Sequence, residues 1–483
     1  MAFTGQLYID GEWTTTGSGG GTFETFDPST GAVIGTAVEA SGSDVDVAVD
    51  AAARAFDDPA WRDMTPAARG KLLWRIADLI EQHADELGEL ESRDVGQVVG
   101  FARGSMAGAA DMFRYFAGWT TKLDGTVSSI SVPGYLHYTR REPVGVCALI
   151  TPWNFPLAIA VWKLAPALAT GNTVVLKPAE QTPLTTTRLV ELVEEAGVPK
   201  GVVNLVTGGP EVGQALVDHP RVDKVSFTGS TEVGRSIVRA SAGNLKRVSL
   251  ELGGKAPNIV LKDADIDQAV IGSMLGGLFN SGQACAAYSR FYVDSSRVDE
   301  FTDKLGSAMS NMKLGPGLAP DTQLGPLVSE EQLARVEGYV KGGIEQGAEV
   351  VLGGKRADGD LAAGFFFEPT LFRGVTHDMT IAREEIFGPV LPVISYDDPE
   401  ELVARANDTD YGLVACVWTK DVALGHRLAH GIRAGEVYIN SMPMLDPAAP
   451  WGGFKASGWG REMAANALDA YTETKGIWVN LGG

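Results

Sequence analysis

Short apolar runs alternate with segments of helical periodicity from about residue 143 to residue 253. The apolar runs read VGVCALI, NTVVL, VVNLV, KVSF and VSLEL, and the helical segments between them cover 156–169, 185–196, 210–217 and 232–241. This rhythm predicts βαβ units and therefore a parallel, doubly wound sheet. Because such sheets bind ligands beyond the carboxyl ends of their strands, the segments that directly follow the apolar runs are candidates for a site.

A second alternation of this kind runs from residue 254 to about residue 455. Its strand-like runs are RFYV, EVVL, VLPVI, LVACVW and EVYI, and its helical segments include 297–311, 329–346 and 420–430. The pattern predicts a second α/β domain. Residues 45–120 show mostly helical spacing, and we expect these helices to pack on the first sheet.

Two β-prone, largely apolar segments fit neither domain: 127–141 and the C-terminal run YTETKGIWVNL. Neither has a partner strand nearby in the sequence, so each is expected to be an edge that needs pairing. We interpret both as oligomerisation strands of a homodimer or homotetramer. The predicted fold class is therefore α/β, with two doubly wound α/β domains and a small β element. The first domain covers 1–124 and 143–253, and the second covers 254–455. The β element covers 125–142 and 456–483.

Composition and charge narrow the function classes. The 483 residues are too many for one hydrophobic core, and 45% hydrophobic with 21% charged residues is typical of folded chains. A net charge of −21 predicts repulsion from nucleic acid and anionic lipid, so neither is an expected partner. The start MAFTGQLYIDGEW lacks a signal-peptide pattern, and no apolar run reaches the ~20 residues that span a bilayer. We expect a soluble, cytoplasmic protein.

The three cysteines lie in different settings. Cys147 and Cys416 fall in apolar runs, where a thiol behaves as a small hydrophobic side chain. Cys285 instead follows FNSGQA and precedes AAYS, a small and polar stretch in which a thiol can be exposed and reactive. Three distant cysteines do not make a disulfide framework.

Other candidate residues are ambiguous when they are taken singly. Glu251 shares a strand face with Ser249, and a solvated face is the default interpretation of that pattern. Asn154 lies between two prolines in PWNFP, where asparagine is usually a turn former. Glu462, in GRE, reads as an exposed helix residue.

Several strings together resemble one known family. TPWNFPL, KPAEQTPL, SFTGSTEVG, ELGGKAPNIV, GQAC, EEIFGPV and PWGGFKASGWGRE are similar to the signature segments of the aldehyde dehydrogenase superfamily, in its order and with its approximate spacing. The resemblance extends from LYIDGEW to KGIWVN. It implies a hydrolytic, NAD(P)-dependent oxidation of a small-molecule aldehyde, with 1–124 and 143–253 as the cofactor-binding domain and 254–455 as the catalytic domain.

The resemblance also implies roles for five catalytic residues. Cys285 is the nucleophile, and the side-chain amide of Asn154 with the backbone N–H of Cys285 forms an oxyanion hole. Glu251 is the general base that activates water for hydrolysis of the thioester. Glu462 resembles a proton relay behind that base, and Lys163 resembles a lysine placed near the relay.

No G-x-G-x-x-G fingerprint follows a strand in this chain, so the cofactor site rests on the resemblance alone. Ser230 begins a helix whose N–H groups meet the pyrophosphate, and Gly229 permits close backbone approach. The carboxylate of Glu180 favours NAD over NADP, because it accepts a hydrogen bond from a 2′-hydroxyl and repels a 2′-phosphate. No metal is implied. The implied cofactor residues are Thr151, Pro152, Trp153, Lys177, Glu180, Gly229, Ser230, Leu252, Gly253, Glu385 and Phe387.

Four aromatic residues resemble the lining of the family's substrate tunnel: Phe155, Trp162, Phe279 and Trp451. They favour hydrophobic or aromatic aldehydes, because apolar burial contributes ~25 cal/mol per Å² removed from water. A betaine-aldehyde-like specificity through cation–π contacts and a broad specificity both stay open. A non-catalytic member is disfavoured because nucleophile and base are both present. Glu251 argues against a CoA-acylating enzyme, and Trp162 stands where semialdehyde enzymes tend to carry an arginine.

Overall fold

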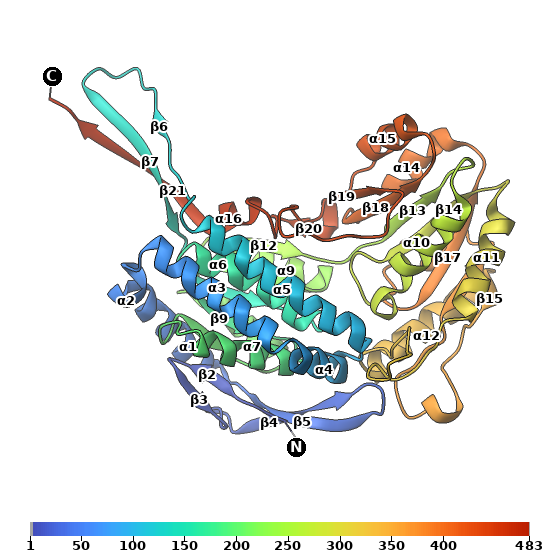
Figure 1. Ribbon diagram of the computed structural model, residues 1–483, viewed down its shortest axis with the longest axis horizontal. Coiled ribbons are helices and arrows are strands. Elements are labelled where there is room, and N and C mark those ends of the chain that lie inside the picture. Colours follow the sequence, from blue (N-terminus) through green and yellow to red (C-terminus); the bar gives the residue numbers. More distant parts are fainter. Residues whose placement is uncertain (1–2, 483) are drawn as a thin grey trace.

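A computed structural model describes residues 3–482 of the chain, so the first two positions and the last position of the predicted ranges lie outside it. The fold is mixed α/β, as expected, and is built on an eight-stranded sheet, a seven-stranded sheet and two three-stranded sheets (Figure 1). Among the described residues no helix is long and apolar enough to cross a membrane.

The eight-stranded sheet has the order β20-β12-β11-β8-β9-β10-β2-β3. Its five central strands are parallel to one another. They are β8 (Val146–Ile150), β9 (Thr173–Lys177), β10 (Val203–Leu205), β11 (Lys224–Thr228) and β12 (Arg247–Glu251). The chain builds outward from β8 in one direction through β9 and β10, and in the other through β11 and β12. This reversal opens a crevice at the carboxyl ends of β8 and β11, where ligands bind in such folds.

The helices cover both faces of this sheet. On one face lie α6 (Pro156–Ala169), α3 (Pro66–Gln82) and α5 (Val99–Trp119), packed on one another. The other face is covered by α1 (Gly42–Asp57), α8 (Pro210–Asp218) and α9 (Thr231–Ser241). The remaining helices of this half are α2 (Pro59–Arg62), α4 (Ala84–Val95) and α7 (Leu184–Glu195). The helical spacing in 45–120 is thereby confirmed, and Cys147 lies in the core as expected.

The seven-stranded sheet has the order β15-β16-β17-β14-β13-β18-β19 and lies at the other end of the molecule (Figure 1). Its strands are β13 (Ala256–Val260), β14 (Tyr288–Asp294), β15 (Glu349–Leu352), β16 (Thr370–Arg373), β17 (Val390–Tyr396), β18 (Val414–Trp418) and β19 (Glu436–Ile439). Its helices are α10 (Ile266–Leu278), α11 (Val298–Ser310), α12 (Glu330–Glu345), α13 (Thr380–Arg383), α14 (Leu402–Asn407) and α15 (Val422–Gly431). The predicted second α/β unit is thus present, with Cys416 buried in β18.

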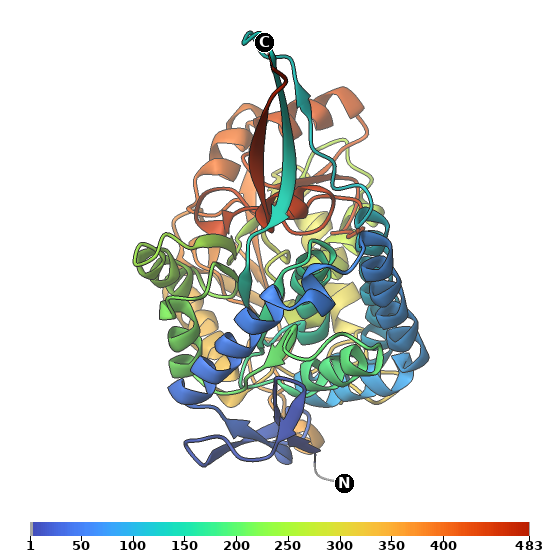
Figure 2. The same cartoon turned by 90° about the vertical axis from the view of Figure 1, so that its left-hand side faces the viewer.

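The two orphan β segments pair with each other. Strand β21 (Thr472–Asn480) runs antiparallel to β7 (Tyr135–Pro143), which also pairs with β6 (Val127–Ser128). This three-stranded sheet projects from the body as an arm (Figures 1 and 2). The sequence places the two segments more than 300 residues apart, so their pairing could not be predicted from local spacing.

Two features differ from the expected division. Strand β20 (Gly458–Trp459) belongs to the predicted C-terminal bridging segment, yet it pairs with β12 at the edge of the large sheet. The N-terminal segment adds β2 (Leu7–Ile9) and β3 (Glu12–Thr14) to the opposite edge. It also forms a small separate sheet of β1 (Phe3–Gly5), β4 (Gly21–Asp27) and β5 (Ala32–Glu39). Short α16 (Asn466–Ala470) leads into β21.

Candidate active site

The loop that carries Cys285 is held in a tight conformation between the 3-10 turn η1 (Phe279–Gly282) and β14. Asn280 and Ser281 have φ of +47° and +57°, which L residues seldom adopt. Gly282 has φ of +73°, and a Cβ there would lie 2.1 Å from the carbonyl oxygen of Gly388. Glycine is therefore required at 282, and the loop backbone has little freedom to move.

Asn154 is tied to this loop by hydrogen bonds. Its Nδ2 donates to the carbonyl oxygen of Gln283 over 2.9 Å. Its own carbonyl oxygen accepts from Nδ2 of Asn280 at 3.1 Å and from Nε2 of Gln97 at 2.8 Å. Sequence reasoning missed Gln97 and Asn280. Asn280 lies inside the motif around Cys285 and could have been found there, whereas nothing in the sequence distinguishes Gln97.

The Cys285 thiol is partly buried and belongs to no disulfide. Burial raises its pKa well above 9, and the nearby carboxylates of Glu251 and Glu385 raise it further. The backbone N–H groups of Ala286 and of Cys285 itself counter this in part. Burial and the two carboxylates therefore disfavour the thiolate, the form in which a cysteine is a strong nucleophile, while the two backbone N–H groups favour it.

Glu251 is the last residue of β12 and its side chain is buried. The default interpretation of its pattern, a solvated strand face, is therefore wrong, because other parts of the chain pack over this face of β12. Burial and the like charge of Glu462 raise its pKa well above 4.5, while Lys163 and Arg461 partly oppose the shift. Neither carboxylate oxygen has a hydrogen-bond partner within residues 3–482.

Glu462 is not an exposed helix residue, contrary to its isolated sequence interpretation. It is buried and forms an isolated β-bridge with Trp451, through N–H to carbonyl hydrogen bonds of 2.7 Å in both directions. Its carboxylate forms an ion pair with Lys163 of α6, which is completely buried. The structure thus brings Glu251, Lys163 and Glu462 together although they are separated by up to 300 residues. Glu251 and Glu462 are buried rather than exposed to solvent, because the chain after β19 folds back over β12.

Gly452 shapes the contact between these acids. It has φ of +155° and follows Trp451, the partner of Glu462. A Cβ at Gly452 would lie 2.8 Å from Oε1 of Glu251 and 2.8 Å from the carbonyl oxygen of Gly460. A side chain at this position would therefore displace the Glu251 carboxylate.

Most of the predicted cofactor residues follow the carboxyl ends of neighbouring strands in the large sheet. Ser230 caps α9, and its Oγ accepts a hydrogen bond from the N–H of Val233 at 3.3 Å, so the predicted helix start is confirmed. The hydroxyl of Thr151 is buried and has no partner among the described residues. The set comprises Thr151, Pro152 and Trp153 after β8, Lys177 and Glu180 at β9, Gly229 and Ser230 after β11, and Leu252 and Gly253 after β12.

Lys177 and Glu180 lie side by side at the end of β9. The Nζ of Lys177 donates to the carbonyl oxygen of Pro178 at 3.1 Å and lies 3.8 Å from Oε2 of Glu180. Burial lowers the pKa of Lys177, and the charge of Glu180 partly restores it. The Glu180 side chain is 36% exposed, which leaves its carboxylate accessible to a ligand.

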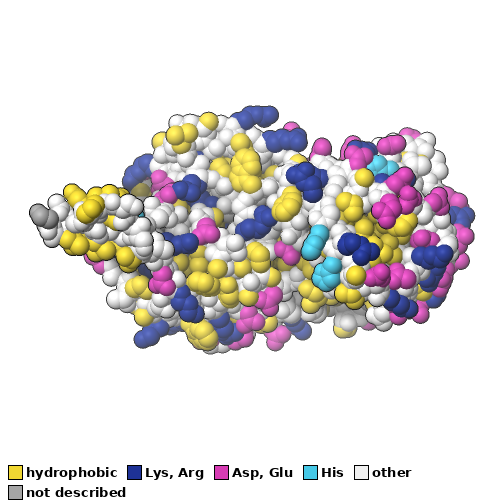
Figure 3. All heavy atoms as spheres, turned by 90° about the horizontal axis from the view of Figure 1, so that it is seen from above, with side chains coloured by type: hydrophobic (Ala, Val, Ile, Leu, Met, Phe, Trp, Pro, Cys, Tyr) yellow, Lys and Arg dark blue, Asp and Glu magenta, His cyan; other side chains and the backbone are white. Residues whose placement is uncertain are grey.

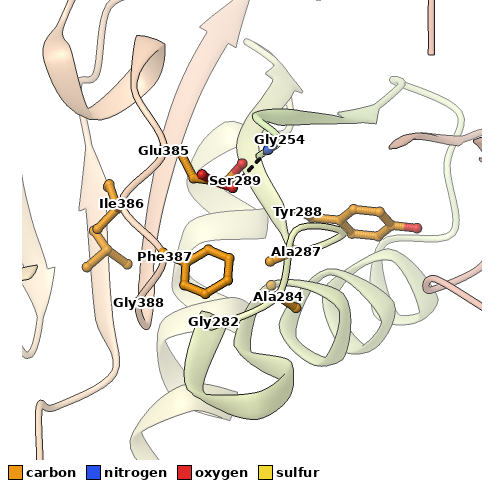
Figure 4. A pocket seen from close by; sticks show the side chains of 12 residues that line it. Gly254, Gly282, Ala284, Ala287, Tyr288, Ser289, Glu385, Ile386, Phe387 and Gly388 are labelled. Carbon is orange, nitrogen blue, oxygen red and sulfur yellow. Dashed lines mark hydrogen bonds between the residues drawn. The ribbon is translucent and has the colours of Figure 1, made fainter. Parts of the chain in front are cut away.

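Glu385 and Phe387 lie in the loop between α13 and β17, in the other α/β unit, and face the nucleophile loop across a small cavity (Figure 4). Oε1 of Glu385 accepts a hydrogen bond from the N–H of Gly254 at 2.8 Å. Burial raises the pKa of Glu385 to about 7. The Phe387 ring lies perpendicular to Trp153, with 5.2 Å between ring centroids. Loops that adjoin both large sheets therefore meet at one place.

The four predicted tunnel aromatics form two pairs. Phe155 and Phe279 stack with centroids 5.4 Å apart, and Trp162 and Trp451 lie 6.1 Å apart. Phe101 of α5 completes the first pair, because its ring packs edge-on against Phe279 at 4.6 Å. Sequence reasoning missed Phe101, since a phenylalanine in a helical pattern reads as core.

Comparison with known proteins agrees with this arrangement. The sequence model described as the aldehyde dehydrogenase family matches residues 13–477. A betaine aldehyde dehydrogenase of Bacillus subtilis is 46% identical, with 98% of this chain and 97% of that protein covered. An aldehyde dehydrogenase of Aspergillus niger is 46% identical over 99% of this chain and 95% of its own length. The NAD⁺ complex of a Bacillus cereus aldehyde dehydrogenase superposes with a TM-score of 0.97 at 48% identity, with 99% and 97% of the two chains covered. The resemblance read from the sequence is confirmed.

Proposed function

Because this chain belongs to the aldehyde dehydrogenase family, a family of oxidoreductases, we propose that it oxidises an aldehyde to a carboxylic acid through a thioester on Cys285, with NAD⁺ as hydride acceptor. The observation that carries the proposal is the hydrogen-bonded link between Asn154 and the Cys285 loop. This link holds an amide donor near the Cys285 thiol, and the charge of Glu251 raises the pKa of that thiol.

The first step is addition of the Cys285 thiolate to the aldehyde carbonyl, which forms a C–S bond and leaves an alkoxide. The amide of Asn154 and the backbone N–H of Cys285 stabilise that oxygen, because fixed donors need no reorganisation as charge develops. Gln97 and Asn280 hold the Asn154 backbone, so they fix the direction of the donor. Departure of hydride from the alkoxide carbon leaves the thioester.

The second step is hydrolysis of the thioester. Glu251 takes a proton from water, whose oxygen bonds to the acyl carbon, and the C–S bond breaks to return the thiolate. A raised pKa suits a general base that works near neutral pH. Glu462 receives the proton from Glu251, and Lys163 stabilises the Glu462 carboxylate between turnovers.

The cofactor residues fit a dinucleotide at the crevice of the large sheet. The buried hydroxyl of Thr151 and the N-terminal N–H groups of α9 offer hydrogen bonds to it. A bound nicotinamide dinucleotide supplies the hydride acceptor. Lys177 and Glu180 would hold the adenosine ribose, with Trp153, Leu252, Gly253, Glu385 and Phe387 around the nicotinamide end. Since Glu180 repels a 2′-phosphate, kcat/KM should favour NAD⁺, and a value favouring NADP⁺ would refute this assignment.

Hydrophobic or aromatic aldehydes are the proposed substrates. The stacked pair Phe155 and Phe279, extended by Phe101, supports this proposal, because an apolar substrate group that packs against such rings is removed from water at a gain in free energy. Trp162 and Trp451 could instead hold a cationic aldehyde by cation–π contacts, in line with the betaine aldehyde dehydrogenase among the relatives. Comparing kcat/KM for benzaldehyde and for betaine aldehyde separates the two, and a clear preference for betaine aldehyde would refute the first.

We further propose that the arm joins subunits of a homodimer or homotetramer. Its sheet exposes large apolar side chains, as Figure 3 shows at the projecting end of the molecule. Such a patch on a sheet is unusual for a monomer. The exposed residues are Tyr135, Leu136, Trp478 and Val479. In this division 1–124 with 143–253 binds the cofactor, 254–455 carries the nucleophile, and 125–142 with 456–483 bridges subunits in the cytoplasm.

The proposal is tested by two variants and one matched control. Cys285→Ala should lose turnover by ~10⁴-fold or more while still binding NAD⁺, because the thiolate is the covalent centre. Cys416→Ala, which alters a buried cysteine in β18, should keep its activity. Glu251→Gln should show a burst of NADH followed by a steady rate ~10²–10⁴-fold lower. More than about a hundredth of wild-type rate in Cys285→Ala would overturn the assignment.

A further inference from the structure

Strands β11 and β12 carry a polar face inside the protein. Side chains alternate along a strand, and the parallel register pairs Ser226 with Ser249 and Thr228 with Glu251. The polar face therefore consists of Lys224, Ser226, Thr228, Arg247, Ser249 and Glu251. The opposite face consists of Val225, Phe227, Val248 and Leu250, which pack in the apolar core with α8 and α9. One end of the polar face lies at Glu251, and the other lies at the amino ends of the strands.

This polar face is covered rather than solvated. All of its side chains except Arg247 are buried. Lys163 of α6, Glu462 and Tyr471 lie over it, and all three are buried as well. Burial of so many polar groups in one row costs free energy, which a purely structural sheet avoids by using apolar residues on both faces.

At the inner end, Ser226 joins the ion pair of Lys163 and Glu462. The Nζ of Lys163 donates to Oγ of Ser226 at 3.3 Å, and this hydroxyl donates to Oε1 of Glu462 at 3.3 Å. Ser226 is therefore the next hydroxyl beyond the two charged groups, on the side away from Glu251.

At the outer end, the Nζ of Lys224 donates to Oγ of Ser249 at 2.7 Å. It also lies 4.7 Å from the ring centroid of Tyr471. Both Lys224 and Ser249 line a hollow at the surface, together with Arg247 and Asp469 at the root of the arm. Burial lowers the pKa of Lys224 to about 8, so this amine can take up and release a proton near neutral pH.

Several polar atoms along the row lack a protein partner. Within the described chain, from 3 to 482, no hydrogen bond is made by either oxygen of Glu251, Oε2 of Glu462 or Oγ1 of Thr228. Buried polar atoms are normally satisfied by protein or by ordered water, and a polar space with several such atoms can hold water. Water between them would complete a continuous hydrogen-bonded path.

We propose that this row is a proton exit path from Glu462 and Lys163 through Ser226 to Ser249 and Lys224, and from there to solvent at the hollow. The inference rests on the proposed function. For each thioester hydrolysed, water gives one proton to Glu251 while its oxygen bonds to the acyl carbon. One proton leaves at the hollow, so charge balances and no electron is transferred. The path lets Glu251 regain its basic form without returning the proton through the opening used by the substrate.

The test compares Ser226→Ala with Ser226→Thr. The alanine variant removes the hydroxyl beyond the ion pair, and threonine keeps it in a residue suited to a strand. We expect Ser226→Ala to retain the burst of NADH but to lower the steady-state rate ~10-fold or more, with a larger solvent deuterium isotope effect. Ser226→Thr should restore the rate. Thr173→Val, which alters another buried, unpaired hydroxyl of the same sheet on β9, is the control and should turn over normally.

A second variant guards against a folding defect in the first. Ser249→Ala acts at the outer end of the path, and release of protons to a pH indicator should lag behind NADH formation in both alanine variants. Wild-type steady-state rate and isotope effect in Ser226→Ala and Ser249→Ala would overturn the exit path, while the burst in Glu251→Gln would leave the proposed function intact. Absence of that burst would overturn the proposed function and the inference with it.

Discussion

Replacing Lys163 by methionine tests how strongly the buried ion pair supports the site. The side chains of Lys163 and Glu462 are 0% and 6% exposed, so water screens the pair little. Removal of one partner from a buried pair leaves an uncompensated charge and costs ~3–5 kcal/mol. At ~2–4 °C per kcal/mol for a domain of this kind, we expect the melting temperature to fall by on the order of 10 °C.

The double variant Lys163→Met with Glu462→Met distinguishes charge from packing. With both charges gone, a buried pair of apolar side chains is commonly neutral or stabilising, so the melting temperature should recover. The steady-state rate should stay low, because the relay carboxylate is missing. Arg54→Met breaks an exposed pair with Asp10, whose side chains are 61% and 51% exposed, and should leave the melting temperature unchanged.

Thermal unfolding followed by circular dichroism, with NADH formation in parallel, reads both effects. A melting temperature of Lys163→Met equal to that of the Arg54→Met control would show that the buried ion pair does not stabilise the fold. A wild-type steady-state rate in the double variant would show that the pair has only a structural role.

Three further predictions follow from the same geometry. Gly452→Ala should slow steady-state turnover ~100-fold while keeping the NADH burst, because its Cβ displaces the Glu251 carboxylate; an unchanged rate would show that the carboxylate position is not critical. Glu251 is active only when deprotonated, so activity falls as pH drops through its raised pKa, and Glu462→Gln should move this acid limb to lower pH by removing a like charge; a shift to higher pH would contradict this. Phe101→Ala should raise KM for benzaldehyde about 2- to 10-fold and leave KM for acetaldehyde unchanged; equal effects on both substrates would argue against an aromatic contact.

The sequence was sufficient for elements whose hydrophobic periodicity is local. The alternation after residue 143 predicted the five parallel strands, and the helix expected at 156–169 has those same bounds. Burial of Cys147 and Cys416 followed from their apolar neighbours. In these segments propensity and tertiary packing favour the same structure, so short-range reasoning succeeds.

Long-range pairing is where the sequence was insufficient. Glu251 and Glu462 read as exposed because a strand or helix pattern shows which residues share a face, and not what covers that face. The cover comes from the chain after β19, two hundred residues later, through the bridge to Trp451. Gln97 lies after an ordinary helix, and only the fold brings it to Asn154.

The covalent intermediate on Cys285 is tested most directly by mass spectrometry of Glu251→Gln after rapid acid quenching with NAD⁺ and benzaldehyde. Slow deacylation in this variant should let the acyl-enzyme accumulate. We predict a mass gain of one benzoyl group on the peptide that contains Cys285, formed in step with the NADH burst and absent without NAD⁺. An unmodified Cys285 peptide during active turnover, or the acyl group on another residue, would contradict the account.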